Sequence, residues 1–344
     1  MTKTIRHRDT QDRAEVLPLK SVQVMLTNKC NLQCRICNIY REKNKTTLSL
    51  SALKNLIQFL LRHTRRLECL NLTGGEPTLE YRLIIRLLQT VVPLVASNRI
   101  REFNINTNAS LLAPLKAITS VIPNALKNRF SFSVTLHGWK EDYSPCGPRK
   151  RLFWDVTRAI AFLRSQGHKV DILFVVSPWT HRYVYRAYQL ARTFDCGIEY
   201  AFYTTQTRSF YHYDKPLDNG LETDGWKKES AWQWDRILDE GAVKCRKYQI
   251  VHLRDFMKGR VVPDEVFRRC LRPQRIIFVR CTGEIYTCFQ SGPVSRFKKL
   301  DERDWQNLLS GREKLMRDIK KHGCRHCLLG ALKWDHSASL KKPS

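Results

Sequence analysis

The sequence predicts an α/β protein built around a parallel sheet. Apolar runs alternate with segments of helical periodicity from about residue 20 to residue 240. The runs recur at about 30-residue spacing, which leaves room for a helix between successive parallel strands. Several of the runs are almost continuously apolar, as expected of strands whose two faces are both buried.

The alternation gives a definite order of elements. We expect strands over residues 21–27, 66–73, 101–108, 129–136, 169–176 and 197–204. Helices are expected between them, near residues 49–63, 79–92, 112–122, 150–166 and 180–194. Ser49 or Ser51 is expected to cap the first helix, and Thr180 the last.

The chain changes character after residue 205. Residues 206–244 are aromatic and charged, and we expect a loop followed by an exposed connecting helix. RIIFVRCTGEIYTC (275–288) predicts a hairpin around a Thr-Gly turn, followed by a helix near 301–320. Cysteines are dense in this half: Cys245, Cys270, Cys281, Cys288, Cys324 and Cys327.

The composition limits which classes of binding partner and which cellular compartment we expect. The chain has 60 Lys and Arg against 32 Asp and Glu, a net charge of +28, which suits either an anionic partner or simply a basic, well-solvated surface. The first residues are charged and contain no secretory signal, and the most apolar stretch, 83–96, is too polar and too short to span a membrane. We therefore expect a cytoplasmic protein, in which the 12 cysteines serve metal or redox chemistry rather than disulfides.

Three of the cysteines directly follow the first expected strand. Cys30, Cys34 and Cys37 have the spacing C-x3-C-x2-C. Thiolates are soft ligands for iron–sulfur clusters or zinc, and a structural zinc site needs a fourth ligand, which is not nearby in the sequence. Three ligands on a four-iron cluster leave one iron open, so the motif favours a reactive cluster over a zinc site completed from elsewhere.

A second motif, GGEP, ends the second expected strand. Gly74 and Gly75 allow the backbone to approach a ligand closely. Glu76 is suited to accept a hydrogen bond from an ammonium group, and Pro77 suits the first turn of a helix. Taken alone, the motif is also typical of a simple turn.

Together, "CNLQCRIC" and "LNLTGGEPTLE" resemble the signatures of the radical S-adenosylmethionine (SAM) superfamily. The resemblance implies a partial (β/α)6 TIM-like barrel over residues 21–205, with residues 1–20 as a basic tail. It also implies that the three cysteines hold a 4Fe–4S cluster and that SAM occupies the open iron. Reductive cleavage of SAM would give a 5′-deoxyadenosyl radical that abstracts hydrogen from the substrate. The electron would come from a reductant such as flavodoxin or ferredoxin.

Two further strand ends resemble SAM-contacting segments of this family. INTNAS contains Thr107 and Asn108, and SVTLHG contains Thr135, with His137 where the family often has Asp. The resemblance therefore implies cofactor contacts at Gly74, Gly75, Glu76, Pro77, Thr107, Asn108 and Thr135. The alternative for these strand ends is ordinary packing and turn chemistry.

The C-terminal cysteines resemble the opening of the SPASM pattern in its shortened "twitch" form. That form implies a small cysteine-rich α+β domain, expected over 245–335, with 336–344 as a tail. It also implies an auxiliary 4Fe–4S cluster held by Cys270, Cys288, Cys324 and Cys327. A structural zinc site with the same ligands is the alternative, and Cys245 or Cys281 is a substitute for one of the four. A related enzyme that cyclises GTP has a Gly-Gly tail, which the ending SLKKPS does not match.

The family acts on several substrate classes. We expect a ribosomally made peptide or a protein as substrate, with the chain acting as a maturase. The alternatives are a small-molecule dehydrogenase or an enzyme of cofactor biosynthesis, and, less favoured, an enzyme that modifies RNA. A non-catalytic nucleic-acid-binding protein is disfavoured by the two intact motifs. The sequence does not single out a catalytic acid or base, because several candidate residues follow the predicted strands.

Overall fold

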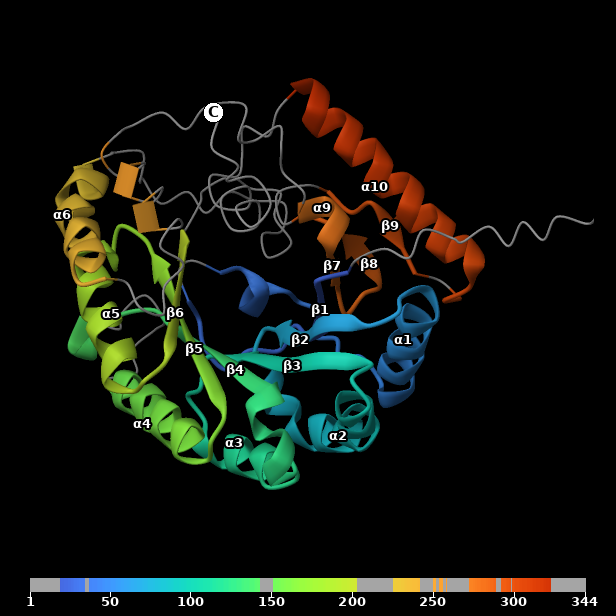
Figure 1. The fold of residues 1–344 in the computed structure, drawn as a ribbon, viewed down its shortest axis with the longest axis horizontal. Helices are drawn as coiled ribbons and strands as arrows, with labels where there is room; N and C mark the ends of the chain where they lie inside the picture. Colours follow the sequence, from blue (N-terminus) through green and yellow to red (C-terminus); the bar gives the residue numbers. More distant parts are fainter. Residues whose placement is uncertain are drawn as a thin grey trace, which may run out of the picture.

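The structure is a computed structural model, and it describes residues 19–34, 37–142, 151–202, 225–241, 250–251, 254–255, 258, 272–288, 292–297 and 299–322. Its centre is one sheet of nine strands in the order β6-β5-β4-β3-β2-β1-β7-β8-β9. The sheet curves into an open, TIM-like partial barrel (Figure 1). The strands are β1 (Ser21–Thr27), β2 (Leu67–Gly74), β3 (Ile100–Thr107), β4 (Phe130–Leu136), β5 (Lys169–Val176), β6 (Gly197–Phe202), β7 (Ile276–Val279), β8 (Glu284–Tyr286) and β9 (Ser295–Arg296).

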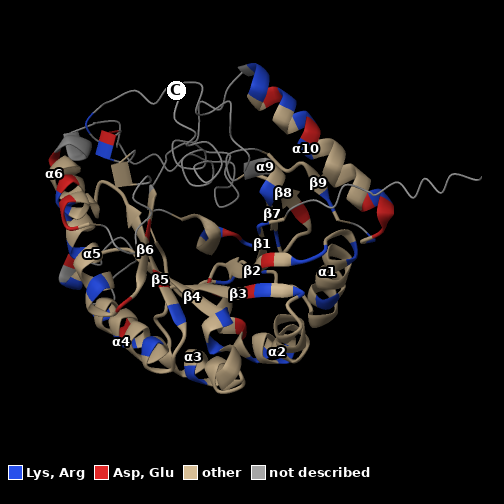
Figure 2. Ribbon diagram, in the orientation of Figure 1, with Lys and Arg blue, Asp and Glu red and all other residues tan. Residues whose placement is uncertain are grey.

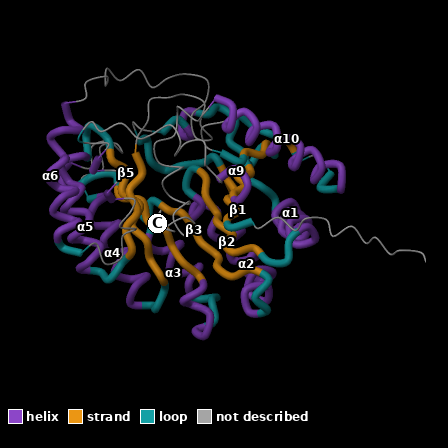
Figure 3. Tube along the Cα trace, turned by 45° about the horizontal axis from the view of Figure 1, so that its top comes forward, coloured by secondary structure: helices purple, strands orange, loops and turns teal. Residues whose placement is uncertain are grey.

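Helices cover the outer face of the curved sheet, while the strands line its inside (Figures 1 and 3). α6 packs on α5 beside the β6 edge, and α10 packs beside β9 at the other edge. The helices are α1 (Leu50–His63), α2 (Tyr81–Ala96), α3 (Leu112–Thr119), α4 (Leu152–Ser165), α5 (Val184–Thr193), α6 (Gly225–Asp239), α9 (Arg272–Arg275) and α10 (Glu302–His322). Short 3-10 turns are η1 (Ile39–Arg41), η2 (Pro77–Glu80), η3 (Asn124–Arg129), η4 (Lys140–Asp142) and η6 (His181–Tyr183).

The core lies between the sheet and its outer helices. On β3, Phe103 and Ile105 are buried against this layer, and Asn104 between them points to the inside of the barrel. The inner residues are polar: the Asn104 side-chain amide donates to Asn71 Oδ1 at 2.9 Å and to Ser133 Oγ at 3.1 Å. The barrel therefore has an apolar outer layer and a hydrogen-bonded inner wall.

The predicted order of the first six strands is confirmed, and all five of their pairings are parallel. Ser49 caps α1, accepting from the Ala52 amide at 3.1 Å. The expected cap at Thr180 is wrong, because its hydroxyl donates to the Val175 carbonyl at 2.6 Å and a 3-10 turn precedes α5. Side-chain bonding to the preceding strand thus replaces the cap.

The predicted hairpin is present as β7 and β8, but it is not a separate sheet. β7 pairs in parallel with β1, with Ser21 opposite Ile276 and Val24 opposite Val279. The sequence pattern gave each strand but not the partner of β7, which lies about 250 residues away along the chain. The domain limits expected near 205, 245 and 335 stay predictions, since the chain around each limit lies outside the described residues.

An aromatic cluster attaches α10 to the barrel. The Trp305 ring stacks on His63 of α1, with ring centroids 4.4 Å apart and planes at 11°. Phe59 meets Trp305 edge-on at 5.9 Å and Phe297 at 5.2 Å. Beside them, Arg62 donates to the Leu300 carbonyl at 3.1 Å. The C-terminal segment is therefore packed against the first helix of the barrel.

Lys and Arg are distributed over many of the outer helices rather than on one of them (Figure 2). Across the described part of the chain, no helix is long and apolar enough to cross a membrane.

Trp305→Ala is expected to lower the free energy of unfolding by about 3 kcal/mol, because it removes a buried ring that packs on Phe59 and His63. Urea unfolding followed by circular dichroism would measure the change. Trp232→Ala is the matched control, since Trp232 is 57% exposed and should change the value by less than about 0.5 kcal/mol. Equal losses in the two variants would contradict this account of how α10 is attached.

Candidate functional site

The three cysteines lie on the segment between β1 and α1. We call this segment, residues 27–49, the cysteine loop. Asn28 is 1% exposed and ties the two ends together. Its backbone amide donates to the Thr46 carbonyl at 3.1 Å, and its Oδ1 accepts from the Thr46 amide at 2.6 Å. Its side-chain amide donates to the Asn44 carbonyl at 2.8 Å and to the Glu42 carboxylate. One buried asparagine thus fixes where the loop leaves and rejoins the sheet.

Cys30, Cys34 and Cys37 lie on this loop, Cys34 buried and the other two half-buried. Burial raises the pKa of Cys30 to about 11 and that of Cys37 to about 12, and the neighbouring thiols of the group contribute in the same direction. Such thiols stay protonated at neutral pH unless a positive centre is bound beside them.

The donor set fits a soft, positively charged metal centre, because one short loop carries three thiols. In the described ranges, no three Cys, His, Asp or Glu side chains already converge as a set of metal ligands. Residues 35 and 36, inside the motif, lie outside these ranges.

Gly74 and Gly75 are packed against the backbone of the cysteine loop. A Cβ atom at Gly74 would lie 2.2 Å from the Thr27 carbonyl oxygen, and one at Gly75 would lie 2.1 Å from the Lys29 carbonyl oxygen. The Gly75 amide donates to Thr27 at 2.8 Å, and the Glu76 amide donates to Lys29 at 2.7 Å. Gly74 also has φ +148°, which side chains rarely adopt. Both glycines are thus required by the neighbouring loop itself.

Glu76 is a buried carboxylate that accepts four hydrogen bonds. Its Oε1 accepts from the Thr78 amide and hydroxyl at 3.0 and 2.6 Å and from the Thr107 hydroxyl at 2.8 Å, and its Oε2 accepts from the Asn108 amide at 2.6 Å. The Thr107 hydroxyl accepts from the Ala109 amide at 2.9 Å, which leaves its own proton for Glu76. Burial raises the pKa of Glu76, and the four donors act in the opposite direction.

The Glu76 carboxylate has no cationic partner among the described residues. The nearby Lys29 pairs with Glu80 instead, at 2.8 Å. A carboxylate that is 1% exposed and surrounded by donors is stabilised by a bound cation. An ammonium group of a ligand is therefore the chemistry that this position fits.

A second set of hydrogen bonds joins the cysteine loop to the end of β3. Asn108 donates to Asn31 Oδ1 at 2.9 Å, Asn31 donates to Ser110 Oγ at 2.9 Å, and Ser110 Oγ donates to Asn108 Oδ1 at 2.7 Å. Sequence reasoning missed Asn28, Asn31 and Ser110. Asn28 and Asn31 flank Cys30, but no sequence signal gives their partners.

Thr135 and His137 lie at the end of β4, one strand beyond Thr107. Thr135 is half-buried and pairs with Leu173 of β5. Burial lowers the pKa of His137 to about 4, so this imidazole is neutral at physiological pH. The predicted contacts at Gly74, Gly75, Glu76, Pro77, Thr107, Asn108 and Thr135 are thus gathered at the carboxyl ends of β2, β3 and β4.

Of the four cysteines predicted to hold the auxiliary cluster, Cys288 alone lies among the described residues. Cys288 is buried just beyond β8, at the open end of the hairpin, and Cys281 is buried in the turn at its closed end. Burial also raises the pKa of Cys281 to about 11. Cys270, Cys324 and Cys327 lie outside the described residues.

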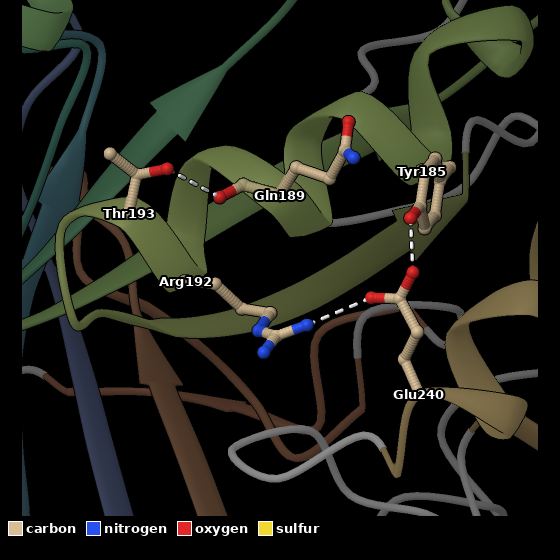
Figure 4. Close-up of a pocket in the computed structure, with 5 residues that line it drawn as sticks. All are labelled: Tyr185, Gln189, Arg192, Thr193 and Glu240. Atoms are coloured by element: carbon tan, nitrogen blue, oxygen red, sulfur yellow. Dashed lines mark hydrogen bonds and ion pairs between the residues drawn. The ribbon is translucent and has the colours of Figure 1, made fainter.

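A separate open hollow of about 450 Å³ lies on the outer surface, at α5 and the end of α6 (Figure 4). It is lined by Tyr185, Gln189, Arg192, Thr193 and Glu240. The Glu240 carboxylate accepts from the Tyr185 hydroxyl and from Arg192 at 2.9 Å, so its charge is already compensated. Its lining residues come from α5 and the end of α6 and share none with the cysteine loop or the GGEP turn.

Comparison with known proteins agrees with this geometry. The profile described as "Radical SAM superfamily" matches residues 24–191, which span β1 to α5. An uncharacterised protein of Methanocaldococcus jannaschii is 31% identical over 94 residues, which are 27% of this chain and 32% of that protein. A probable GTP 3′,8-cyclase of Metallosphaera sedula is 29% identical over 96 residues, 28% of this chain and 29% of that protein. The matched segment thus spans about a third of each relative.

Solved structures share the fold over most of the chain. anSMEcpe with bound AdoMet and Cp18Cys peptide has a TM-score of 0.62 at 17% identity, covering 91% of this chain and 88% of that chain. SuiB of Streptococcus suis bound to S-adenosylmethionine has a TM-score of 0.63 at 12% identity, covering 92% and 72%. SuiB bound to its precursor peptide SuiA has a TM-score of 0.62 at 14% identity, covering 93% and 72%.

Gly75→Ala is expected to lower the free energy of unfolding by about 1–3 kcal/mol, because the added methyl overlaps the Lys29 carbonyl. Thermal unfolding would measure the loss. Gly292→Ala is the matched control, since a Cβ there meets no atom within 4 Å. If the two variants were equally stable, the close packing of GGEP on the cysteine loop would be wrong.

The stability of the protein is expected to depend on His137 in mild acid. The pKa falls from 6.5 to about 4 on folding, so the unfolded chain binds a proton in this interval that the folded protein does not. The contribution of His137 to the free energy of unfolding is therefore greatest above about pH 6.5, and it decreases as the pH falls towards 4. Relative to His137→Gln, the wild type should lose about 1–2 kcal/mol between about pH 7 and pH 5 in urea unfolding. A difference that stays constant over this range would show that folded His137 protonates freely.

Proposed function

We propose that this chain, whose residues 24–191 match the radical SAM superfamily profile, binds a 4Fe–4S cluster through Cys30, Cys34 and Cys37 and S-adenosylmethionine beside Glu76. The observation that carries the proposal is the direct packing of the GGEP turn on the cysteine loop, through the contacts to Thr27 and Lys29. A ligand bridging the two motifs would meet sulfur donors on one side and a buried carboxylate on the other.

The residues of the site have different roles in binding the cofactor. A bound cluster would supply the electron for reductive cleavage of SAM, and the resulting 5′-deoxyadenosyl radical would abstract hydrogen from the substrate. Glu76 would accept a hydrogen bond from the ammonium group of SAM, and its four existing hydrogen bonds hold the carboxylate in place for this contact. Thr107 and Asn108 donate hydrogen bonds to that carboxylate, and Thr135, at the adjoining strand end, would contact a sugar hydroxyl.

The substrate is proposed to be a ribosomally made peptide or a protein. Two solved structures with this fold are of proteins bound to peptides, anSMEcpe with Cp18Cys peptide and SuiB with precursor peptide SuiA. The net charge of +28 also suits a polymeric, anionic partner more than a small neutral one. The alternative, small-molecule or cofactor chemistry, is supported by the resemblance to a probable GTP 3′,8-cyclase, which lies within about a quarter of the chain.

An auxiliary 4Fe–4S cluster is proposed at Cys270, Cys288, Cys324 and Cys327. Cys288 is at the open end of the β7–β8 hairpin, the end at which the chain from Cys270 enters through α9. Cys281 is in the turn at the other end, beside Arg280, which pairs with Glu42 of the cysteine loop at 3.0 Å. This arrangement favours Cys288 over Cys281 as the ligand.

Anaerobic reconstitution tests the proposal through the metal content. Wild type is expected to hold about eight irons, and the Cys30/Cys34/Cys37→Ala variant about four, as two cysteine-bound clusters require. With SAM and dithionite, wild type should release 5′-deoxyadenosine and the variant should not.

Cys69→Ala is the control, since Cys69 is a half-buried thiol on β2 outside both cysteine groups, and its iron content should equal that of wild type. About four irons and one zinc in wild type would make the C-terminal site structural. Wild type that holds its iron but releases no 5′-deoxyadenosine would contradict the proposed activity.

A further inference from the structure

A group of aromatic and basic side chains lies at the rim of the barrel, beyond β4 and β5. We call it the rim cluster and define it by Trp139, Lys140, Phe153, Trp154, Tyr183 and Arg186. Its members come from the loop after β4, the first turn of α4 and the start of α5. Because β1 to β6 are parallel, these segments are at the same end of the barrel as the cysteine loop and Glu76.

The aromatic rings form one continuous contact series. Trp139 meets Phe153 at 4.9 Å and stacks over Tyr183 at 6.4 Å, between ring centroids. Phe153 in turn meets Trp154 edge-on at 5.2 Å. Trp154 is 50% exposed, although its ring partner Phe153 is buried. The series thus ends in a supported, solvent-facing indole.

Two cations lie over these rings without a carboxylate partner in the described part of the chain. The Arg186 guanidinium is 6.0 Å from the Trp139 ring and 5.8 Å from the Tyr183 ring. The Lys140 ammonium is 6.0 Å from the Trp154 ring. Their neighbour Arg182 is different, since it pairs with Asp142 at 3.0 Å. Exposed aromatic and arginine side chains are the residue types that dominate binding energies at interfaces.

We propose that the rim cluster is a docking surface for an acidic, partly apolar segment of the peptide or protein substrate. The proposal rests on the function proposed above and specifies the class of its substrate. Glutamate or aspartate side chains would pair with Arg186 and Lys140, and an apolar side chain would cover Trp154. Charge complementarity supports this occupant, since the whole chain carries +28. The carboxylate of Asp142 within the same surface disfavours a continuous phosphate backbone over a peptide with spaced charges.

The test measures fluorescence anisotropy of the reconstituted holoenzyme with SAM and a short labelled peptide. In this peptide, glutamates alternate with leucine and serine, and its counterpart has glutamine at every glutamate position. We expect the glutamate peptide to bind more tightly, and Trp154→Ala and Arg186→Gln each to weaken its binding about fivefold. The matched controls are Trp232→Ala, another exposed tryptophan, and Lys116→Ala, another exposed cation over a ring, and both should bind like wild type.

Each other outcome decides against the proposal. Equal binding of the two peptides, no measurable binding, or equal losses in all four variants would overturn it. A uridine oligonucleotide that binds more tightly than the glutamate peptide, and is weakened by the same two rim variants, would make the surface a nucleic-acid site instead.

Release of 5′-deoxyadenosine by wild type without any peptide tests the proposed function separately. If it occurs while peptide binding fails, only the docking surface is wrong. If it fails while peptide binding depends on the rim cluster, the proposed function is wrong and the docking surface stands.

Discussion

The contact on which the site depends is the one between two backbone turns. The carbonyl oxygens of Thr27 and Lys29 occupy the space where side chains at Gly74 and Gly75 would lie, and they accept the amides of Gly75 and Glu76. This contact fixes the position of the loop that carries the sulfur donors relative to the turn that carries the carboxylate. Any ligand that bridges the two motifs is therefore received by a preformed arrangement, and its binding need not order both segments.

The second constraint is electrostatic. Glu76 is buried, accepts hydrogen bonds from four donors and has no cation among the described residues, while Cys30 and Cys37 are held as neutral thiols by burial. The site therefore has an excess of negative or potentially negative groups in a medium of low polarity. Binding of positive charge, as a metal cluster on one side and an ammonium group on the other, relieves both penalties together.

Much of the fold followed from the sequence, for a physical reason. Strands buried on both faces are almost continuously apolar, and crossover helices have a helical period, so the order of β1 to β6 was readable. The two motifs were readable because each is local in the chain. What the sequence could not give were interactions between distant residues: the triangle of Asn31, Asn108 and Ser110, the addition of β7 beside β1, and the bonding of Thr180 to Val175 in place of a cap. Polar side chains have no periodic signal, and their partners are set by the folded geometry.

The parallel sheet connects the chemistry to the proposed docking surface. Successive parallel strands must place their carboxyl ends on one side, so a single topological rule brings the cysteine loop, Glu76 and Trp139 to the same rim. The two sides of that rim differ in charge. Near β1 and β2 the described groups include the thiols, the buried Glu76 and the Lys29–Glu80 ion pair, whereas near β4 and β5 exposed cations lie over aromatic rings. A substrate with an acidic segment would be attracted to the second side by these cations. This attraction would orient the substrate across the open barrel, with its acidic part at α4 and α5 and its uncharged part nearer to Glu76.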